Sequence, residues 1–413
     1  MAKNHFDTLI IGGGAAGITV AASLRKRVPQ AGHTIGIIEP SDQHYYQPAF
    51  TLVGAGVCKL EDMRRKTSNL IPNGVTWIKA SAEAIDAENH TVKLNDGEEL
   101  VYKHLVVCTG IEINWEKIDG LKTAVGKNGV CSNYSPDTVE STYAAIQSLQ
   151  AGQHAVFTQA PLPFKCPGAP QKIAYLTADY LSQRKIRDQV KVSFNTHGPS
   201  IFGVPYFAER LVPIAERHGI EVNYQKNLIA VDGDAKEAEF EYVSDARKGE
   251  KEIVKFDMLH VTPHQSPAAF IRSSALANEA GYVDIDQHSM RSTKFENVFA
   301  LGDVGSSPNS KTAAAVRKQA PVVVKHILAD LGGTNSDASY DGYGSCPLTT
   351  ALGKTMIAEF TYGGKVTPTL PLDPGKESRF YWWVKKTGLP LMYWHYMLKG
   401  HEAIPEHNVN FKP

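Results

Sequence analysis

The stretch Thr8-Leu9-Ile10-Ile11-Gly12-Gly13-Gly14-Ala15-Ala16-Gly17 decides the fold, because it joins an apolar strand to a glycine loop. In such a loop Gly12 allows the tight turn, Gly14 lets the backbone approach a pyrophosphate, and Gly17 lets the next helix pack on the strand. A helix predicted from Gly17 to Arg27 would point its unpaired N–H groups at the phosphates. The stretch therefore predicts a dinucleotide-binding unit of the Rossmann type.

An acidic residue and a later strand complete this unit. The predicted strand Thr34 to Ile38 ends at Glu39, 22 residues after Gly17, where a carboxylate can accept hydrogen bonds from ribose hydroxyls. A further apolar strand, His104 to Cys108, ends at Thr109 and Gly110. A glycine loop framed by a strand, a helix and a terminal acid is a specific signal, whereas a lone glycine motif is weak.

The middle of the chain lacks a second glycine loop. Flavoprotein reductases that use a pyridine nucleotide carry one there, but the strand His154 to Thr158 runs into Gln159-Ala160-Pro161-Leu162-Pro163-Phe164-Lys165-Cys166-Pro167. Prolines have no N–H group and cannot cradle a pyrophosphate. The sequence therefore indicates that electrons enter through sulfur chemistry rather than from a nicotinamide.

A Gly-Asp pair indicates which dinucleotide the first unit binds. The predicted strand that ends in Leu301-Gly302-Asp303 is followed by Lys311-Thr312-Ala313-Ala314. In flavoproteins with two dinucleotide domains, such an aspartate contacts the ribityl chain, and the next helix stabilises the reduced flavin with its positive end. We therefore predict FAD; the alternative is that Asp303 only caps a helix.

Bulk properties limit the class of protein. A chain of 413 residues should form two or three domains. Lys plus Arg and Asp plus Glu both number 43, so there is no basic field to hold nucleic acid. The first predicted strand begins at Phe6, which leaves no room for a signal peptide, and we expect a cytoplasmic location. Five cysteines are too few for a disulfide scaffold, so any disulfide should be catalytic.

The order of strand and helix signals predicts an α/β fold. We expect two Rossmann-like dinucleotide-binding domains, as in glutathione reductase, and a C-terminal segment that faces a membrane. The predicted boundaries are 1–132 and 297–338 for the two parts of the FAD-binding domain, 133–296 for a degenerate second copy, and 339–413 for the C-terminal region. The charged stretch Asp245 to Glu250 should be a solvated hairpin or loop.

Two cysteines lie in similar surroundings. Cys166 precedes Pro167 and Cys346 precedes Pro347, and both segments look irregular rather than apolar and regular. Loops made rigid by proline often display reactive groups. This pattern makes the two residues candidates for a reactive pair.

At this point the chain resembles the sulfide:quinone oxidoreductase family, within it the two-cysteine branch that includes the mitochondrial enzyme of animals. The resemblance follows the chain in order through short segments. These are His44-Tyr45-Tyr46-Gln47-Pro48, Thr51 to Gly56, Ser132-Asn133-Tyr134-Ser135, Lys165 to Ile173, His260-Val261-Thr262-Pro263, Gly302-Asp303, Lys311 to Val316 and Tyr343 to Leu348.

The resemblance implies that Cys166 and Cys346 are the catalytic redox pair beside FAD. It also implies FAD contacts that residue patterns alone do not give, namely Gln47 and Ala82. The full set of predicted cofactor contacts is Gly12, Gly14, Ala15, Ala16, Gly17, Glu39, Gln47, Ala82, Thr109, Gly110, Gly302, Asp303, Lys311, Thr312, Ala313 and Ala314. The implied partners are sulfide, a membrane quinone, and glutathione, sulfite or coenzyme A as the sulfur acceptor, with no metal.

Several residues near this chemistry have weaker signals. A neighbouring lysine lowers a cysteine pKa, so Lys165 is a candidate activator of Cys166. Cys108 and Cys58 are interpreted as buried hydrophobic residues. Cys131 is a separate candidate, because some branches of the family use a third cysteine near its position. His197 and His264 are candidate bases, although a structural role fits either one better.

The C-terminal segment Arg379 to Leu398 is rich in Trp and Tyr. Lys385 and Lys386 divide it, and two lysines at the centre of a bilayer cost roughly 5 to 7 kcal/mol, so it should not span one. Rings and lysines together suit the headgroup region, and several such tails in a homo-oligomer would strengthen attachment at the cytoplasmic side of the membrane. The alternative is an aromatic lid on the core. Tyr343 and residues 353–360 are candidate walls for a quinone.

Three other functions remain open on sequence grounds. A type II NADH:quinone reductase would share the fold and the tail, but Gln159 to Cys166 argues against it. A sulfide dehydrogenase that delivers electrons to a cytochrome would need a periplasmic signal. A sensor without catalysis would use the flavin and the cysteines only to signal sulfide.

Overall fold

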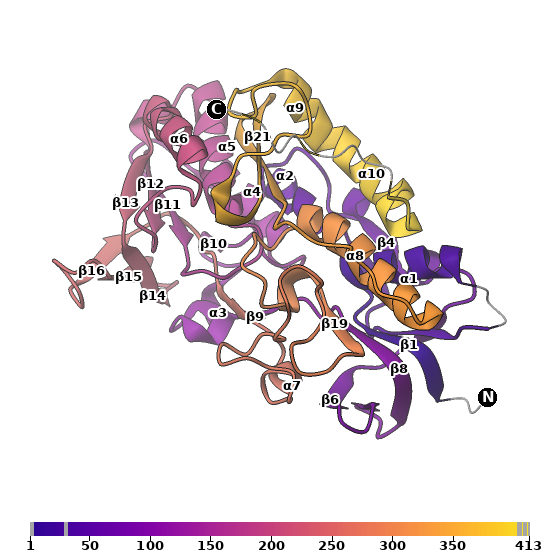
Figure 1. The fold of residues 1–413 in the computed structure, drawn as a ribbon. Helices are drawn as coiled ribbons and strands as arrows, with labels where there is room; N and C mark the ends of the chain where they lie inside the picture. The colour runs from indigo at the N-terminus through magenta and orange to yellow at the C-terminus, as the bar shows by residue number, and fades with distance from the viewer. Residues whose placement is uncertain (1–3, 29–31, 403–406, 408–410, 412–413) are drawn as a thin grey trace.

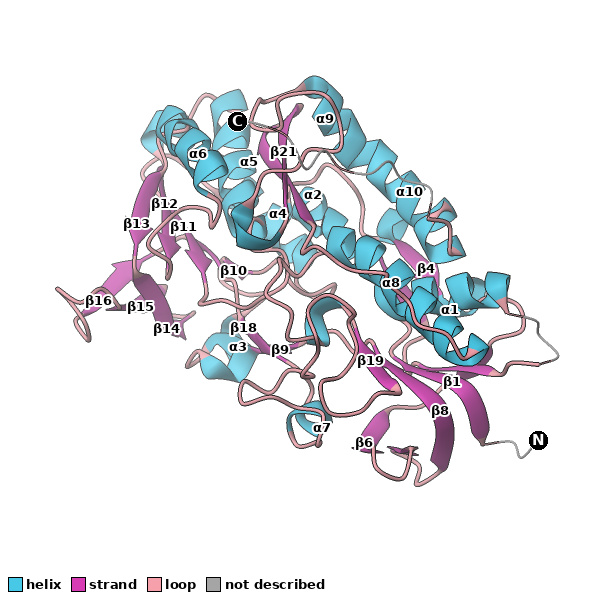
Figure 2. Ribbon diagram, in the orientation of Figure 1, coloured by secondary structure: helices cyan, strands magenta, loops and turns pink. Residues whose placement is uncertain are grey.

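The computed structural model describes residues 4–28, 32–402, 407 and 411. Two mainly parallel sheets with helices packed on them form the two halves of the molecule (Figures 1 and 2). The first sheet lies at the lower right of Figure 1 and the second at the left. The α/β architecture expected from the sequence is confirmed.

The first sheet contains the strand that leads into the glycine loop. Its strands are β1 (His5–Ile11), β2 (Ile35–Ile38), β5 (Thr76–Ile78), β6 (Ala82–Asp86), β7 (Thr91–Leu94), β8 (Glu99–Val107) and β19 (Val298–Ala300). The order is β5-β2-β1-β8-β7-β6, and β19 pairs with β8 in parallel. Because the central strands are buried on both faces, they read as continuous apolar runs. The pairing of β19 shows that the chain returns to its first unit, as the sequence predicts.

Two long helices lie beside this sheet. They are α1 (Ala15–Arg27), which follows the glycine loop, and α8 (Ala313–Gly332), which follows the Gly-Asp pair. Both begin at the end of the sheet where their preceding strands finish. Their amino termini therefore converge on one place, which is where a dinucleotide binds in such folds.

The second sheet is fully parallel. Its strands are β10 (Val130–Cys131), β11 (His154–Gln159), β12 (Lys191–Thr196), β13 (Glu221–Tyr224) and β17 (Met258–His260), in the order β10-β17-β11-β12-β13. The accompanying helices are α4 (Val139–Ser148), α5 (Ala169–Gln183) and α6 (Pro205–Arg217). A separate antiparallel sheet of β14 (Lys226–Asp232), β15 (Glu237–Tyr242) and β16 (Lys251–Lys255) places the charged stretch 245–250 in a turn, as expected.

Short elements connect these layers. They are β3 (Gln43–Tyr45), β4 (Arg64–Lys66), α2 (Phe50–Gly54), β9 (Glu112–Asn114), α3 (Leu121–Ala124), β18 (His264–Ser266) and α7 (Ala269–Arg272). Strands β9 and β18 pair antiparallel and join segments that are about 150 residues apart, since His264 lies opposite Asn114.

The C-terminal region divides between the two cores. The hairpin of β20 (Gly344–Ala351) and β21 (Lys354–Phe360) packs Cys346, Leu348 and Met356 into the core of the second sheet. The following run, α9 (Arg379–Trp383), a π-helical turn (Val384–Gly388) and α10 (Leu389–His395), lies along one edge of the molecule, in yellow in Figure 1. This run contributes Tyr393 and Trp394 to the core of the first sheet. None of the helices in the described part of the chain has the length and apolar character needed to cross a bilayer.

Candidate flavin and thiol site

A cavity of about 690 Å³ lies where the two halves and the C-terminal region meet. Its volume is in the range of small-molecule sites. Most of the predicted cofactor contacts line it: Gly12, Gly14, Ala15, Ala16, Glu39, Gln47, Thr109, Gly110, Gly302, Asp303, Lys311, Thr312, Ala313 and Ala314. Gly17 and Ala82 do not line this cavity; Gly17 lies inside α1, and Ala82 begins β6.

The glycine loop has the geometry that its sequence predicts. A Cβ atom on Gly17 would lie 1.9 Å from the Gly12 carbonyl oxygen, so the helix can approach the strand only without a side chain there. Gly12 has a φ of +102°, and a Cβ would lie 2.4 Å from the Cys108 carbonyl oxygen. A Cβ on Gly14 would have no atom within 4 Å, so this backbone faces open cavity. The loop therefore leaves its backbone at Gly14 accessible from the cavity, as a phosphate-binding glycine turn requires.

Glu39 lies at the end of β2 beside this glycine loop. Its carboxylate accepts hydrogen bonds from the backbone N–H groups of Gly13 and Ser41, both at 2.8 Å. These bonds hold the side chain at the cavity wall, where the sequence predicts ribose recognition.

The Gly-Asp segment and the start of α8 form the facing wall. Burial raises the pKa of Asp303, while the positive charges of Lys311 and Lys165 oppose this change. Burial lowers the pKa of Lys311 to about 8, and its ammonium group donates to the Gly305 carbonyl at 3.0 Å. Thr312 caps α8 by accepting a hydrogen bond from the Ala315 N–H. The positive end of the helix therefore points into the cavity, as predicted for a flavin site.

The structure brings Cys166 and Cys346 together. Their Sγ atoms are 4.0 Å apart, although 180 residues separate them in the sequence, and both are free thiols. Cys166 lines the cavity, whereas Cys346 is buried behind it in the second core. The loop is packed tightly, since a Cβ on Gly168 would lie 2.6 Å from the Cys346 Sγ. The backbone N–H of Cys166 donates to the Lys311 carbonyl at 2.9 Å, which links the thiol loop to the start of α8.

Lys172, not Lys165, contacts the sulfur atoms. The Lys172 Nζ lies 3.4 Å from the Cys166 Sγ and 3.6 Å from the Cys346 Sγ. Lys165, the predicted activator of Cys166, donates instead to the Gln47 Oε1 at 2.7 Å, although its positive charge still interacts with Cys166. Lys172 lies in the first turn of α5, where the helix after the thiol loop turns its buried face to the pair.

The two thiols have opposite tendencies to ionise. The pKa of Cys166 is well below its usual range because Cys346 donates a hydrogen bond to it, and because Lys172 and Lys385 add positive charge. The pKa of Cys346 is raised, since it keeps the proton that it donates and is buried. Although burial lowers the pKa of Lys172, the two sulfurs raise it overall. A thiolate on Cys166 beside a protonated Cys346 is the favoured state of the reduced pair.

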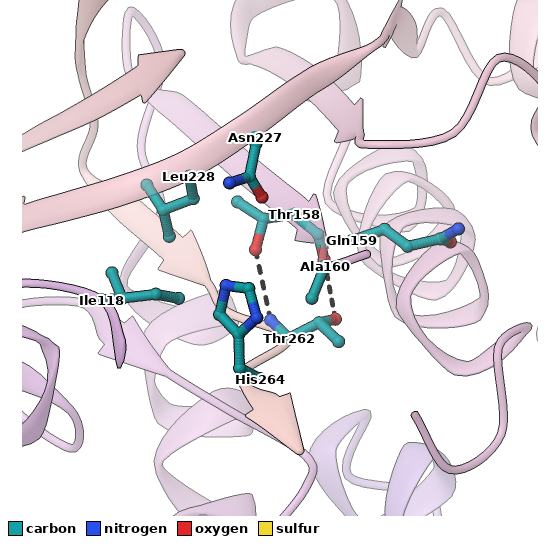
Figure 3. A pocket seen from close by; sticks show the side chains of 8 residues that line it. All are labelled: Ile118, Thr158, Gln159, Ala160, Asn227, Leu228, Thr262 and His264. Atoms are coloured by element: carbon teal, nitrogen blue, oxygen red, sulfur yellow. Dashed lines mark hydrogen bonds between the residues drawn. The ribbon is translucent and has the colours of Figure 1, made fainter. Parts of the chain in front are cut away.

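The end of β11, where a second nucleotide would bind, is closed. Thr262 donates through its N–H and its hydroxyl to Thr158, at 3.2 and 2.7 Å, and seals the strand end. Figure 3 shows these two bonds with His264 close by. The small pocket among these residues, which Gln159 and Ala160 also line, has no volume that a water molecule could enter. The absence of a glycine loop thus corresponds to a filled site rather than an open one.

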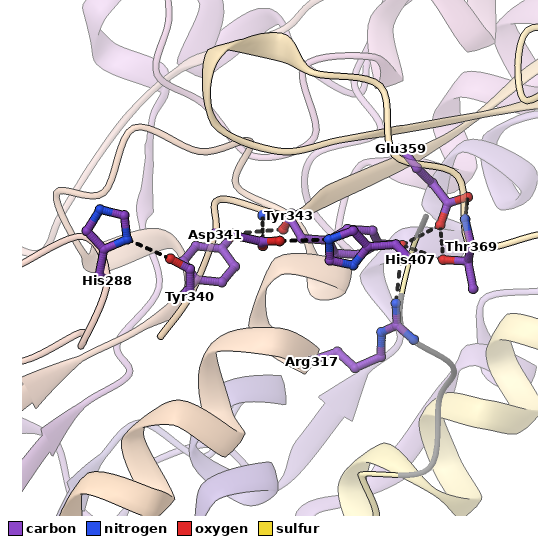
Figure 4. A network of polar contacts seen from close by, with 8 residues as sticks. All are labelled: His288, Arg317, Tyr340, Asp341, Tyr343, Glu359, Thr369 and His407. Atoms are coloured by element: carbon purple, nitrogen blue, oxygen red, sulfur yellow. Dashed lines mark hydrogen bonds and ion pairs between the residues drawn. The ribbon is translucent and has the colours of Figure 1, made fainter. Parts of the chain in front are cut away.

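A polar network forms another part of the cavity wall (Figure 4). Glu359 accepts hydrogen bonds from the Tyr343 hydroxyl at 2.5 Å and from the Thr369 N–H at 2.9 Å. Arg317 donates to the same Tyr343 hydroxyl at 3.2 Å. Tyr343 and two members of the segment 353–360, Ile357 and Glu359, line the cavity, where the sequence placed a quinone wall.

The C-terminal run has two different faces. Its inner face lines the cavity through Val384, Lys385, Leu389, Met392, Tyr393 and Met397, and the Tyr393 hydroxyl bonds to the His44 Nε2 at 2.6 Å. Its outer face exposes Trp383, Leu391 and the adjoining Tyr396, each by about half (51 to 55%), and Phe380, which is 47% exposed, also lines the cavity. The run is therefore both a lid on the core and an exposed aromatic surface, so both interpretations of its sequence apply to different faces.

Lys385 corrects the prediction for this segment. We expected both lysines of the run to lie among headgroups, but Lys385 is only 2% exposed and donates to the Pro48 carbonyl. The π-helical turn directs it inward, while Lys386 is exposed.

The remaining candidates lie away from the thiol pair. Cys131 is buried, and its Sγ faces the Leu259 carbonyl at 3.6 Å. Cys108 is buried at the cavity wall, and burial raises its pKa. His264 belongs to the closed pocket at the end of β11, and burial lowers its pKa and that of His197.

Comparisons with known proteins give the chain its family. Residues 6–154 match the family model described as pyridine nucleotide-disulphide oxidoreductase. The mitochondrial sulfide:quinone oxidoreductase of Dictyostelium discoideum is 44% identical over 399 residues, which are 96% of this chain and 87% of that protein. The enzyme of the same name from Mus musculus is 38% identical over 404 residues, 98% of this chain and 89% of that one.

A solved structure has the same fold. The sulfide:quinone oxidoreductase from the hyperthermophilic bacterium Aquifex aeolicus superposes with a TM-score of 0.79 at 19% identity, over 97% of this chain and 92% of that one. The sequence identities over nearly the full length, together with this fold, confirm the resemblance seen in the sequence. The chain belongs to the sulfide:quinone oxidoreductase family.

Proposed function

We propose that this protein oxidises sulfide at the Cys166–Cys346 pair and delivers two electrons through FAD to a membrane quinone. The observation that carries this proposal is the thiol pair, 4.0 Å apart, at a cavity that has a dinucleotide cradle on its other side. The closed end of β11 supports it, because no second nucleotide has room there.

The chemistry requires two cysteines. When the pair is a disulfide, hydrosulfide attacks one sulfur, the S–S bond breaks, and the products are a persulfide on one cysteine and a thiolate on the other. A nucleophile then removes the outer sulfur of the persulfide; we propose glutathione, sulfite or coenzyme A. Closing the disulfide again releases two electrons, which a bound flavin can accept.

The environment of each sulfur suggests its role. Cys166 lines the cavity and has the lowered pKa, so it is suited to be the thiolate that faces the flavin. Cys346, which retains its proton in the reduced pair, is suited to carry the persulfide. Lys172 contacts both sulfurs and can stabilise negative charge on either one.

We propose FAD as the flavin because the cavity has features for both ends of a dinucleotide. The Gly12–Gly14 loop and Glu39 would hold the pyrophosphate and a ribose, and Asp303 would hold the ribityl chain. The start of α8 would place its positive end near the flavin ring. The residues present therefore fit this cofactor.

The quinone and the membrane belong to the other side of the cavity. Tyr343 and Glu359 would line the quinone pocket beneath the C-terminal run. We propose that the exposed rings of Phe380 and Trp383 meet the membrane surface. Flotation with liposomes should decrease for F380A/W383A and remain unchanged for I253A, which removes an equally exposed side chain (62%) from β16.

An anaerobic absorbance titration tests the function. Sulfide should bleach the flavin of the purified protein in seconds, and a soluble quinone should restore the colour. NADH should leave the spectrum unchanged. Bleaching by NADH but not by sulfide would instead indicate a type II NADH:quinone reductase, and turnover no faster than about one event per minute would indicate a sensor.

A further inference from the structure

A second lysine, from the C-terminal run, lines the same cavity as Cys166. Lys385 lies in the cavity wall with Cys166 and Lys172, and only 2% of it is exposed. Its ammonium group donates to the backbone carbonyl of Pro48, which is a neutral partner. Within the described ranges, no ion pair joins it to a carboxylate. A buried cation of this kind requires a nearby anion to offset the loss of its hydration.

The local backbone is built to turn this side chain inward. Residues Val384–Gly388 form a π-helical turn between α9 and α10. Such turns insert an extra residue into a helix and often occur at functional sites. Here the turn directs Lys385 into the molecule and leaves the adjacent Lys386 exposed.

The charges around Lys385 indicate that cysteine sulfurs are its counter-ions. Lys172 from α5 faces it with a like charge, and burial together with this charge lowers the pKa of Lys385 to about 8. Cys166, Cys346 from β20 and Cys58 are the groups whose negative charge acts in the opposite direction.

Two other charged groups, Lys165 and Asp303, also interact with Cys166, and because their charges are opposite their effects on it oppose one another. Cys58 is disfavoured as an anion, because burial raises its pKa. The ionised thiol of Cys166 is therefore the anion that Lys385 can stabilise.

We propose that Lys385 supplies, beside Lys172, a second positive charge that stabilises the thiolate of Cys166. The proton of the Cys166 thiol leaves to water, and Lys385 remains protonated. In the disulfide state no thiolate offsets the two lysines, so the fraction of them that is protonated attracts hydrosulfide. The hydrosulfide that binds there brings one negative charge. After it attacks the disulfide, that charge is on the cysteine thiolate that is released. The C-terminal run thus contributes directly to the sulfur site as well as covering it.

The test measures ionisation of Cys166 without any substrate. The variant K385Q removes the charge but keeps a donor for the Pro48 carbonyl, and K386Q is the matched control one residue away. The flavin-loaded proteins are reduced with dithiothreitol, desalted without oxygen and alkylated with iodoacetamide across a range of pH. Mass spectrometry then follows the rate at Cys166.

We expect the apparent pKa of Cys166 to rise by about one unit in K385Q, so that alkylation below that pKa is about tenfold slower. K386Q should match the wild type, and K385R should restore the wild-type profile. An unchanged profile in K385Q, or an equal shift in K386Q, would overturn the proposal.

A second measurement on the wild type applies even if K385Q does not fold. Acylation of Lys385 by acetic anhydride should be faster in the disulfide form than in the reduced form, since oxidation removes the thiolate that holds its proton. Equal rates in the two forms would contradict the proposal. The inference rests on the proposed function only where it assumes that sulfide oxidation uses the Cys166 thiolate. Because neither measurement includes sulfide or quinone, each can fail independently of that function.

Discussion

Two strand–loop–helix segments of this molecule start in the same way but present different chemical groups. We call the segment from β1 to α1 the first turn and the segment from β11 to α5 the second turn. After β1, the loop Gly12–Gly14 lines the open cavity and leads directly into the start of α1. After β11, Thr262 from the segment behind β17 packs against the strand end, and a longer loop places Cys166 just before α5. The comparison shows that the loop after a parallel strand determines whether the strand end presents an open glycine turn or a cysteine thiol.

The largest effect on sulfide oxidation should come from removing the thiol of the second turn, Cys166, or that of its partner, Cys346. We expect C166S and C346S each to abolish sulfide-dependent flavin reduction, because neither can form the disulfide that accepts sulfur. Both variants should keep the flavin, since its cradle lies in the first turn. Stopped-flow absorbance checks the reaction, and the flavin-to-protein ratio checks binding. C58S is the control, because Cys58 does not line the cavity, and turnover retained in either variant would refute the paired role.

The next largest effect should come from breaking the first turn. In G17A the new Cβ would lie 1.9 Å from the Gly12 carbonyl oxygen, so α1 must move away from β1. We expect G17A to accumulate poorly or without flavin.

G14A is the informative partner of this variant. No atom lies within 4 Å of a Cβ at Gly14, so the fold should tolerate it while the cradle loses room for the pyrophosphate. We expect a normal thermal unfolding temperature for the flavin-free protein and weaker flavin binding. Equal loss of folding in both variants would show that the loop is only structural.

The sequence predicted the first turn better than the second for a physical reason. Gly17 is required by a contact with the Gly12 backbone five residues away, and Gly12 is required by its own positive φ, so both constraints are visible in a local motif. The strand, the helix and Glu39 follow at fixed spacings, and the structure places them as expected. The pairing of Cys166 with Cys346 came from a resemblance, because no local pattern links residues 180 positions apart.

The lysines show where local reasoning fails. Lys165 is adjacent to Cys166 in sequence, but its side chain is directed to Gln47 rather than to the Cys166 sulfur. Lys172 could have been found from its place in the first turn of the next helix, on the face that turns back toward the loop. Lys385 gave no such signal, since only a π-helical turn directs it inward.

A smaller effect should sharpen the role of the second turn. K172M removes the cation that contacts both sulfurs, so the pKa of Cys166 should rise and less thiolate should be present near neutral pH. We expect sulfide-driven flavin reduction to slow by about 10- to 100-fold at pH 7, which corresponds to one to two pKa units. The rate should recover as the pH increases. A loss that is the same at every pH would mean that Lys172 only supports the packing.

The smallest effect concerns the contact that ties the first turn to the C-terminal run. His44 bonds to the Gly13 carbonyl at 3.2 Å and to the Tyr393 hydroxyl at 2.6 Å, and burial lowers its pKa to about 4. An unfolded histidine titrates near 6.5, so between these values the unfolded chain binds more protons and stability falls as the pH decreases.

The lowered pKa of His44 should therefore decrease the free energy of unfolding by about 2 kcal/mol when the pH falls from 7 to 5. H44Q has no such titration, so its unfolding temperature should fall less than that of the wild type over the same range. Other buried histidines, such as His260, are present in both proteins and cancel in the difference. Calorimetry should show that the difference in unfolding temperature between the wild type and H44Q (the gap) is smaller at pH 5 than at pH 7, by a few degrees at most. A constant gap would mean that His44 has the same pKa in the folded and the unfolded protein, and a widening gap would mean that it is protonated in the folded protein and ties the first turn to the run as a cation.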